Sequence, residues 1–206
     1  MSMARRERLA LADAMIAAGP DASTLCGEWT VRDLAAHLVV RERRPDAAPG
    51  ILIKRFAGYL DRVQADAAQR PFPELIDEVR SGPPWWSPLR PVDAVVNLSE
   101  MFIHHEDVRR AAEEWEPREL PAADQDQLWK LVTRTARMSY RNCPVAVVLE
   151  APGGRRVSAG ADTDEVVLRG EPAELLLHAF GRDNVRIEAS GETLAIEAAL
   201  TCDRSV

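Results

Sequence analysis

The sequence has few cysteines, and none of them forms a closely spaced pair. Cys26, Cys143 and Cys202 are far apart in the chain. The CxxC spacing of a zinc knuckle or a redox motif is therefore missing, and the odd number does not suggest a disulfide framework. Free thiols are typical of a reducing compartment, so we expect a cytoplasmic protein.

The sequence also lacks a basic excess and a long apolar run. Its 33 acidic and 26 basic residues give a net charge of -7, which argues against a nucleic-acid partner. No uncharged apolar stretch reaches the ~18 residues of a membrane span. The basic and apolar residues near the start faintly resemble a signal peptide, but Asp13 interrupts them and their spacing is helical. We therefore expect neither a signal peptide nor a membrane partner.

What the sequence does contain is enough apolar material for a core. Hydrophobic residues make up 46% of the 206 positions and charged residues 29%. This composition is typical of folded globular proteins rather than disordered chains. The length suits one large domain or two small ones.

The first two thirds of the chain have helical periodicity. Apolar residues recur at helical spacing over 5–18, and Gly19-Pro20 ends that run. Thr30 with Asp33 predicts a capping box at the start of a helix that ends near Pro45. Further helices are predicted over 51–69, 91–111 and 122–140, with a short helix and an ordered loop over 71–91. Residues 1–142 are thus expected to form a helical bundle.

The pattern changes after residue 142. Short apolar runs at 145–150, 155–159 and 165–169, separated by glycine-rich turns, predict strands. A helix is expected over 172–180 with Gly181 as its C-cap, followed by two more strands at 185–189 and 193–199. The prediction is a mainly α protein in which a small α+β domain, 143–206, follows the helical domain.

Three residues of the helical part predict a metal site. Glu100 and His104 are four residues apart, so both project from one face of their helix. His37 lies between apolar neighbours on another helix, and three ligands would leave coordination positions open, as in catalytic sites. A simpler interpretation also holds: a hydrogen-bonded core histidine and an ordinary i,i+4 pair. If a metal binds, zinc suits this set best, and nickel or iron is compatible with it.

Neighbouring residues extend this site. Three roles are open for Asp107: a further metal ligand, a hydrogen-bond acceptor for a histidine N–H, or a solvated acid. We favour the acceptor role. Arg41 follows His37 by four residues, and Arg44 lies about one turn further on. Arg41 either grips a carboxylate beside the metal or pairs with an acidic side chain in the bundle. His105 and His178 are interpreted as structural residues.

Two motifs in these segments resemble a known family. The segment 27–38, with the pattern W-T-x-x-D-L-x-x-H, and the segment 100–107, with the pattern E-x-x-x-H-x-x-D, are similar to those of DinB-like proteins related to mycothiol-dependent maleylpyruvate isomerase. The resemblance implies a DinB-like four-helix bundle with His37, Glu100 and His104 as metal ligands. It also implies mycothiol as cosubstrate and an actinobacterial source.

The resemblance continues into the C-terminal part. Residues 169–182 are similar to the sterol-carrier-protein-like domain of those isomerases, in which an arginine assists catalysis. The match places Arg182 in that role. The run 39–50 departs from the isomerase pattern, which indicates a separate metal-binding subgroup and leaves open whether maleylpyruvate is the substrate.

Three functional hypotheses follow. The first is a mycothiol-dependent transferase or isomerase in which the metal activates a small thiol and Arg41 or Arg182 holds a small acidic or electrophilic partner. Arg41 and Arg44 are then the expected cofactor-binding residues. The second is a hydrolase that uses a metal-bound water, with Asp107 or Glu106 as base. The third is a non-catalytic binding or regulatory protein stabilised by its metal.

Overall fold

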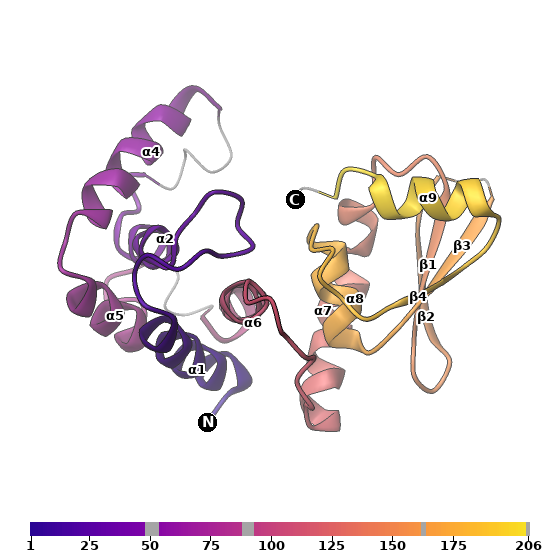
Figure 1. Ribbon diagram of the computed structural model, residues 1–206, viewed down its shortest axis with the longest axis horizontal. Coiled ribbons are helices and arrows are strands. Elements are labelled where there is room, and N and C mark those ends of the chain that lie inside the picture. The colour runs from indigo at the N-terminus through magenta and orange to yellow at the C-terminus, as the bar shows by residue number, and fades with distance from the viewer. Residues whose placement is uncertain (48–53, 88–92, 162–163, 205–206) are drawn as a thin grey trace. The chain divides into compact units, whose positions relative to one another are not determined.

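The computed structural model describes residues 1–47, 54–87, 93–161 and 164–204. Two compact units divide the chain, Met1–Trp115 and Glu116–Val206, and both appear in Figure 1. The predicted beginnings of the helices at 51 and 91 lie outside the described residues. Each unit has its own core and is described by itself.

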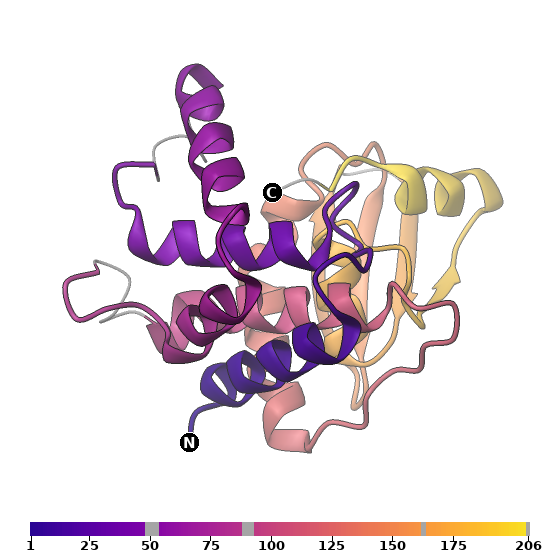
Figure 2. The same ribbon diagram turned by 60° about the vertical axis from the view of Figure 1, so that its left-hand side comes forward.

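The N-terminal unit is a bundle of helices. Its described helices are α1 (Met3–Ala18), α2 (Val31–Arg43), α4 (Lys54–Ala68), α5 (Phe72–Ser81) and α6 (Asp93–Arg109). Helix α1 packs along α6, and α2 packs against both α4 and α5. Figure 2 shows α4 running across α2. The core between them is apolar and includes Leu11, Met15, Leu34, Leu38, Leu75 and Met101. The predicted helical bundle is confirmed.

The start of α2 is fixed by its own sequence. The Thr30 hydroxyl accepts a hydrogen bond from the Asp33 amide at 3.3 Å, and the Asp33 carboxylate accepts one from the Thr30 amide at 2.9 Å. This reciprocal pair satisfies amides that the first helical turn leaves without partners. The predicted capping box is confirmed, and it sets which residues of α2 share a face.

The loop before α2 is attached to α6. The Leu25 amide donates to the Asp107 carbonyl at 3.1 Å. Within the loop, the Thr24 hydroxyl donates to the Trp29 carbonyl at 2.8 Å. These bonds hold the loop over the end of α6, and they place Cys26 and Trp29 beside the polar residues of the bundle.

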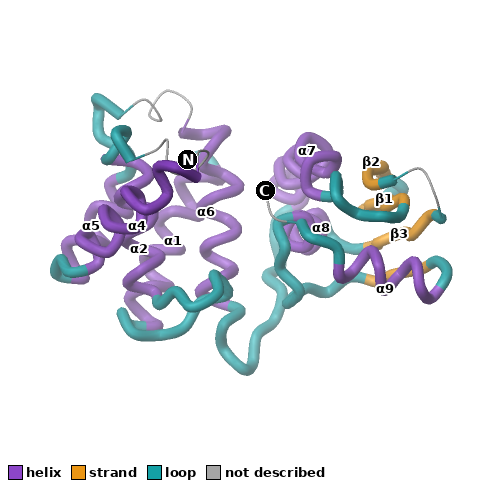
Figure 3. The backbone as a smooth tube through the Cα atoms, turned by 90° about the horizontal axis from the view of Figure 1, so that it is seen from above, coloured by secondary structure: helices purple, strands orange, loops and turns teal. Residues whose placement is uncertain are grey.

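The C-terminal unit combines a small sheet with helices. In chain order it contains α7 (Ala122–Ser139), β1 (Ala146–Ala151), β2 (Arg155–Gly160), β3 (Glu165–Arg169), α8 (Pro172–Ala179), β4 (Glu188–Ser190) and α9 (Thr193–Thr201). The strand order is β2-β1-β3-β4. Strand β1 is antiparallel to β2 and parallel to β3, and β3 is antiparallel to β4. Helices α7 and α8 lie against one face of the sheet (Figure 3).

Two features of this unit differ from the sequence analysis. The division between the units falls after Trp115 rather than at residue 142, because α7 packs against α8 and β2. The segment 193–199, predicted as a strand, is part of helix α9. That prediction was wrong: the Glu192 side chain accepts hydrogen bonds from the Leu194 and Ala195 amides and so caps a helix, and the alanine- and leucine-rich segment has high helix propensity.

His178 of α8 is a core residue, as the sequence analysis expected. Only 1% of it is exposed, and the Tyr140 hydroxyl lies 2.6 Å from its Nδ1. Within the described part of the chain, its buried Nε2 has no hydrogen-bond partner. Burial, together with the charge of Arg204, lowers the pKa of His178 to about 3. The imidazole is therefore neutral in the folded unit at neutral pH.

This histidine makes the stability of the protein depend on pH. In the unfolded chain the imidazole binds a proton below about pH 6.5, whereas in the folded unit it stays neutral down to about pH 3. The contribution of His178 to the free energy of unfolding is therefore complete above pH 6.5. It decreases as the pH falls from 6.5 to about 3, by up to ~1.4 kcal/mol per pH unit. Urea unfolding at pH 7, 6, 5 and 4 should show a weaker pH dependence for His178→Leu than for the wild type. Parallel pH profiles of the free energy of unfolding for the two proteins would contradict this prediction.

Candidate metal centre

The side chains of His37, Glu100 and His104 meet between α2 and α6. Glu100 Oε1 lies 3.2 Å from His37 Nε2 and 3.4 Å from His104 Nε2. One donor atom from each residue lies within 4.8 Å of the other two. The structure thus brings together the three residues that the sequence singled out as ligands.

These separations suit a small tetrahedral cation. Donor atoms bound ~2.1 Å from a tetrahedral zinc lie roughly 3.4 Å from one another. The two distances from Glu100 Oε1, 3.2 Å and 3.4 Å, match that spacing. Two imidazole nitrogens and one carboxylate oxygen are also a typical zinc ligand set, and three protein ligands leave one position for another molecule.

Each histidine is oriented through its second ring nitrogen. His37 Nδ1 lies 3.0 Å from Gln64 Nε2, on α4, and His104 Nδ1 lies 2.9 Å from Asp107 Oδ2. The Cys26 thiol donates to the same Asp107 oxygen at 3.0 Å. Such partners fix the ring orientation of metal-bound histidines. Asp107 was expected as an acceptor, but Gln64 and Cys26 have no signal in the sequence, because neither belongs to a motif with His37, Glu100 or His104.

A chain of buried polar groups continues from the centre into the bundle. Arg41 Nε lies 3.3 Å from Glu100 Oε1, and its NH1 donates to the Asn97 side-chain oxygen. The Asn97 amide nitrogen donates to Glu42 at 3.4 Å, and Glu42 also accepts from Arg8 of α1 at 3.1 Å. Both charged groups of that last pair are almost fully buried. The polar chain therefore connects the site to three helices.

The charges of the centre are strongly coupled. Burial alone raises the pKa of the Glu100 carboxyl, but hydrogen bonds from both ligand histidines and the charge of Arg41 hold it well below its usual value. Burial alone lowers the pKa of His104, but hydrogen bonds, above all that to Asp107, raise it well above its usual value. The surroundings thus favour an ionised carboxylate and positive charge beside it; a metal ion that binds His104 would displace the imidazole proton and supply that positive charge itself.

The centre can also be reached from solvent. The side chains of His37, Glu100 and His104 remain 16%, 23% and 12% exposed, and that of Arg41 remains 14% exposed. A fully enclosed site would exclude any ligand beyond the three side chains. Here each of the four side chains keeps a surface that water can reach.

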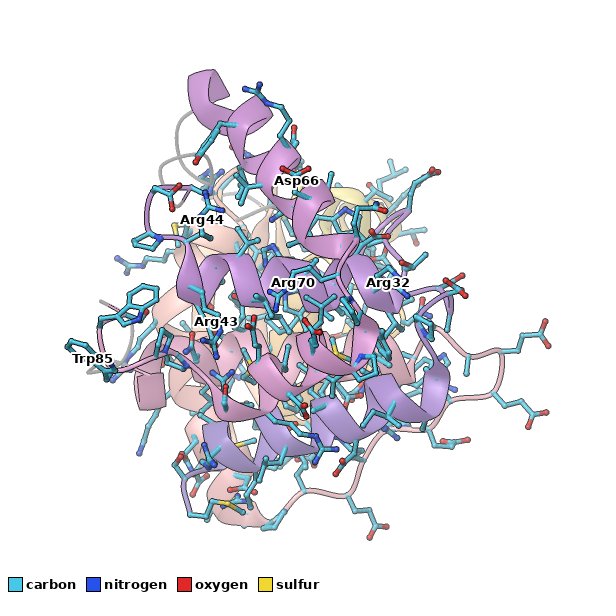
Figure 4. The ribbon with its side chains drawn as sticks, turned by 90° about the vertical axis from the view of Figure 1, so that its left-hand side faces the viewer. Arg32, Arg43, Arg44, Asp66, Arg70 and Trp85 are labelled. Atoms are coloured by element: carbon cyan, nitrogen blue, oxygen red, sulfur yellow. The ribbon has the colours of Figure 1, made fainter. Side chains whose placement is uncertain are left out.

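Arg44 has its described contacts outside the centre, and Arg182 belongs to the other unit. Arg44 pairs with Asp46 at 2.8 Å and lies 3.0 Å from the Tyr59 hydroxyl, in the surface region shown in Figure 4. These contacts of Arg44 are with residues outside the centre, whereas Arg41 contacts Glu100. Arg182 belongs to the C-terminal unit, where its guanidinium donates to the Phe180 carbonyl at 2.6 Å. Its predicted catalytic role stays a prediction.

The remaining histidine of α6 is a packing residue, as expected. His105 Nδ1 lies 2.9 Å from a Glu7 carboxylate oxygen, and both side chains are 7% exposed. This contact joins α6 to α1. His105 and His104 are adjacent in sequence but face different sides of the helix.

Fold and site together define a class of protein: a helical bundle with a convergent His-Glu-His set, followed by a small α+β unit. The family model of the mycothiol maleylpyruvate isomerase N-terminal domain matches residues 2–84. This match lies in the N-terminal unit and agrees with the family that the sequence motifs indicated.

Solved structures agree at the level of the fold. A crystal structure of the mycothiol-dependent maleylpyruvate isomerase is similar with a TM-score of 0.57 and 14% sequence identity, over 93% of this chain and 92% of that one. A crystal structure of a histidine-to-alanine mutant of that enzyme gives the same values. A comparison with curated proteins finds no match. Among the described residues, no helix has the length and apolar character needed to span a bilayer.

The geometry predicts which substitutions remove a bound cation. A second set of donors, Cys26, His104 and Asp107, also converges, and it shares His104 with the first. If the first set holds the ion, metal-free protein takes up one Zn²⁺ per chain with high affinity. Glu100→Gln should then weaken binding by at least about 100-fold through loss of an anionic ligand, whereas Cys26→Ser should leave it nearly unchanged.

Competition titration against a zinc-sensitive dye measures both affinities. Circular dichroism of each variant checks that the bundle is intact. Loss of zinc in Cys26→Ser with retention in Glu100→Gln would move the ion to the second set. Equal, weak binding by all three proteins would mean that these side chains only pack.

Proposed function

We propose that this protein is a metal-dependent enzyme that uses a low-molecular-weight thiol, mycothiol, to transfer or isomerise a small acidic electrophile. The observation that carries the proposal is the open three-donor centre with a guanidinium beside it. A divalent metal held by His37, Glu100 and His104 would accept a thiol and lower its pKa, so that thiolate is available at neutral pH. The family of the N-terminal domain supports the choice of thiol.

Arg41 is the residue proposed to bind the acidic partner. Its contacts with Glu100 and Asn97 hold the guanidinium in place while part of the side chain stays exposed. A guanidinium has five N–H donors, and these two contacts leave others for a carboxylate. Arg41 is thus paired with an acidic side chain in the bundle, and its place beside Glu100 supports the proposal that it also binds a carboxylate.

Ligation through His37 Nε2 sets the state of Gln64. A metal on Nε2 requires the proton of this imidazole to be on Nδ1, where it needs an acceptor. The Gln64 amide lies 3.0 Å from that nitrogen, and it can present its oxygen by rotating about its last side-chain bond. His104 already has a carboxylate oxygen of Asp107 at Nδ1. Both ligands thus have a partner suited to the metal-binding tautomer.

The surroundings of Glu106 and Asp107 argue against either residue as the general base of a hydrolase. Glu106 is 1% exposed, and Arg109 and Arg110 both donate to it, at 3.0 Å and 2.6 Å. Asp107 is fully buried and accepts from the Cys26 thiol beside His104. Neither carboxylate is exposed to solvent. A non-catalytic role for the metal is tested by the experiment below.

Thiol dependence distinguishes the hypotheses. Zinc-loaded protein is incubated with chlorodinitrobenzene or with maleylpyruvate, with and without mycothiol. In the first reaction the thiolate forms a carbon–sulfur bond, chloride leaves with the electron pair of its bond, and the thiol proton passes to solvent. We expect turnover of at least one of the two compounds only when both metal and thiol are present, and its loss in Glu100→Gln.

Variants of the two arginines refine the assignment. For an acidic substrate, Arg41→Lys should raise KM about tenfold or more, because a lysine does not reproduce a two-point contact with a carboxylate. Arg182→Gln tests the role that the family resemblance gives to the C-terminal unit. Turnover without thiol would favour a hydrolase. Failure of every thiol and acid to react or to raise the melting temperature would favour a structural metal.

A further inference from the structure

A pocket adjoins the metal centre on the side of α4. Its volume is about 380 Å³, and its lining residues are Trp29, Asp33, Asp61, Gln64 and Ala65. Two of them touch a proposed ligand: the Trp29 ring lies 5.1 Å from the His37 ring, and Gln64 lies 3.0 Å from His37 Nδ1. The pocket thus adjoins the centre through the contacts of Trp29 and Gln64 with the His37 imidazole.

The sequence of α2 gives the centre two chemically different ends. Asp33, His37 and Arg41 follow one another at intervals of four residues, so they lie along one face of the helix. Each interval advances ~6 Å along the axis. An acid with the Trp29 indole therefore lies on one side of His37, and a guanidinium lies on the other. A negatively charged group is attracted to the Arg41 end and repelled from the pocket.

The lining of the pocket suits a neutral molecule rich in hydroxyl groups. Its polar members are two carboxylates and a carboxamide, which accept hydrogen bonds from O–H groups, and none of the five lining residues is basic. The indole offers an apolar face to the C–H side of a ring. Asp33 already accepts from Thr30, so the exposed Asp61 of α4 is the freer acceptor.

We propose that this pocket binds the hydroxyl-rich rings of the thiol cosubstrate, with Asp61 and Gln64 as hydrogen-bonding partners and Trp29 as the packing surface. The inference rests on the proposed function. Mycothiol carries its cysteine on two such rings, and a thiol seated in this way has its sulfur directed to His37, Glu100 and His104. The acidic partner then occupies the Arg41 end.

Calorimetric titration of zinc-loaded protein with three probes tests the assignment. The probes are mycothiol, N-acetylcysteine as the thiol without rings, and N-acetylglucosaminyl-inositol as the neutral rings without thiol. Asp61→Ala should weaken binding of both ring-containing probes about tenfold, with unchanged affinity for N-acetylcysteine and unchanged zinc content. Asp66→Ala is the matched control, because Asp66 is also exposed on α4 (Figure 4) but lines a different pocket.

The outcomes separate this inference from the proposed function. Equal mycothiol affinity in wild type and Asp61→Ala overturns the pocket and leaves a thiol-dependent enzyme intact. Binding of the rings that depends on Asp61, without any binding of a thiol, supports the pocket and overturns the thiol chemistry. Absence of binding for all three probes overturns both. Equal losses in Asp61→Ala and Asp66→Ala overturn the pocket, because they point to the charge of α4 in general.

Discussion

The Glu100 carboxylate imposes the constraint on which the rest of the bundle depends. A carboxylate held largely away from water is costly unless positive or hydrogen-bonding groups compensate for it. Both ligand histidines and Arg41 converge on one of its oxygens. These groups come from α2 and α6, so the side-chain contacts between these two helices and the ionisation of the carboxylate depend on each other. A divalent cation would satisfy the same requirement with more charge.

The sequence predicted the bundle and its three convergent residues because both rest on local rules. The capping box at Thr30 fixes the start of α2 and therefore the face on which His37 lies. The i,i+4 spacing of Glu100 and His104 fixes their common face of α6. The apolar positions around them give the direction of the core. These signals come from residues that are close together in the sequence, so they can be recognised without the tertiary structure.

Other parts of the site have no such local signal. Gln64 is a single polar residue of an amphipathic helix, and it becomes a partner of His37 only because α4 crosses α2. Cys26 reaches Asp107 because a loop is bonded to a helix 81 positions later in the chain. The strand predicted at 193–199 failed for a different reason: a few alternating apolar residues suit both helix and strand. The Glu192 cap decides between them there.

The position of α7 shows how far the composition of a segment can mislead about its partners. Because α7 follows the helices of the bundle in the sequence, it was predicted to belong to the bundle. Its contacts are instead with α8 and the sheet. A small open sheet must cover one apolar face, and a preceding helix is the nearest element that can do so. The change from a helical to a strand pattern in the sequence therefore occurs at a different residue from the boundary between the two structural units.

The buried pair of Arg8 and Glu42 gives the first helix a role in the charge balance of the centre. Through Asn97 and Arg41 it connects the first helix of the chain to the Glu100 carboxylate. A change at Arg8 leaves an uncompensated charge that its polar neighbours must absorb. Arg8 of α1 lies outside the candidate centre, yet its charge is part of the balance that holds the Glu100 carboxylate. The first helix of the chain is therefore an electrostatic support of the centre as well as a packing element.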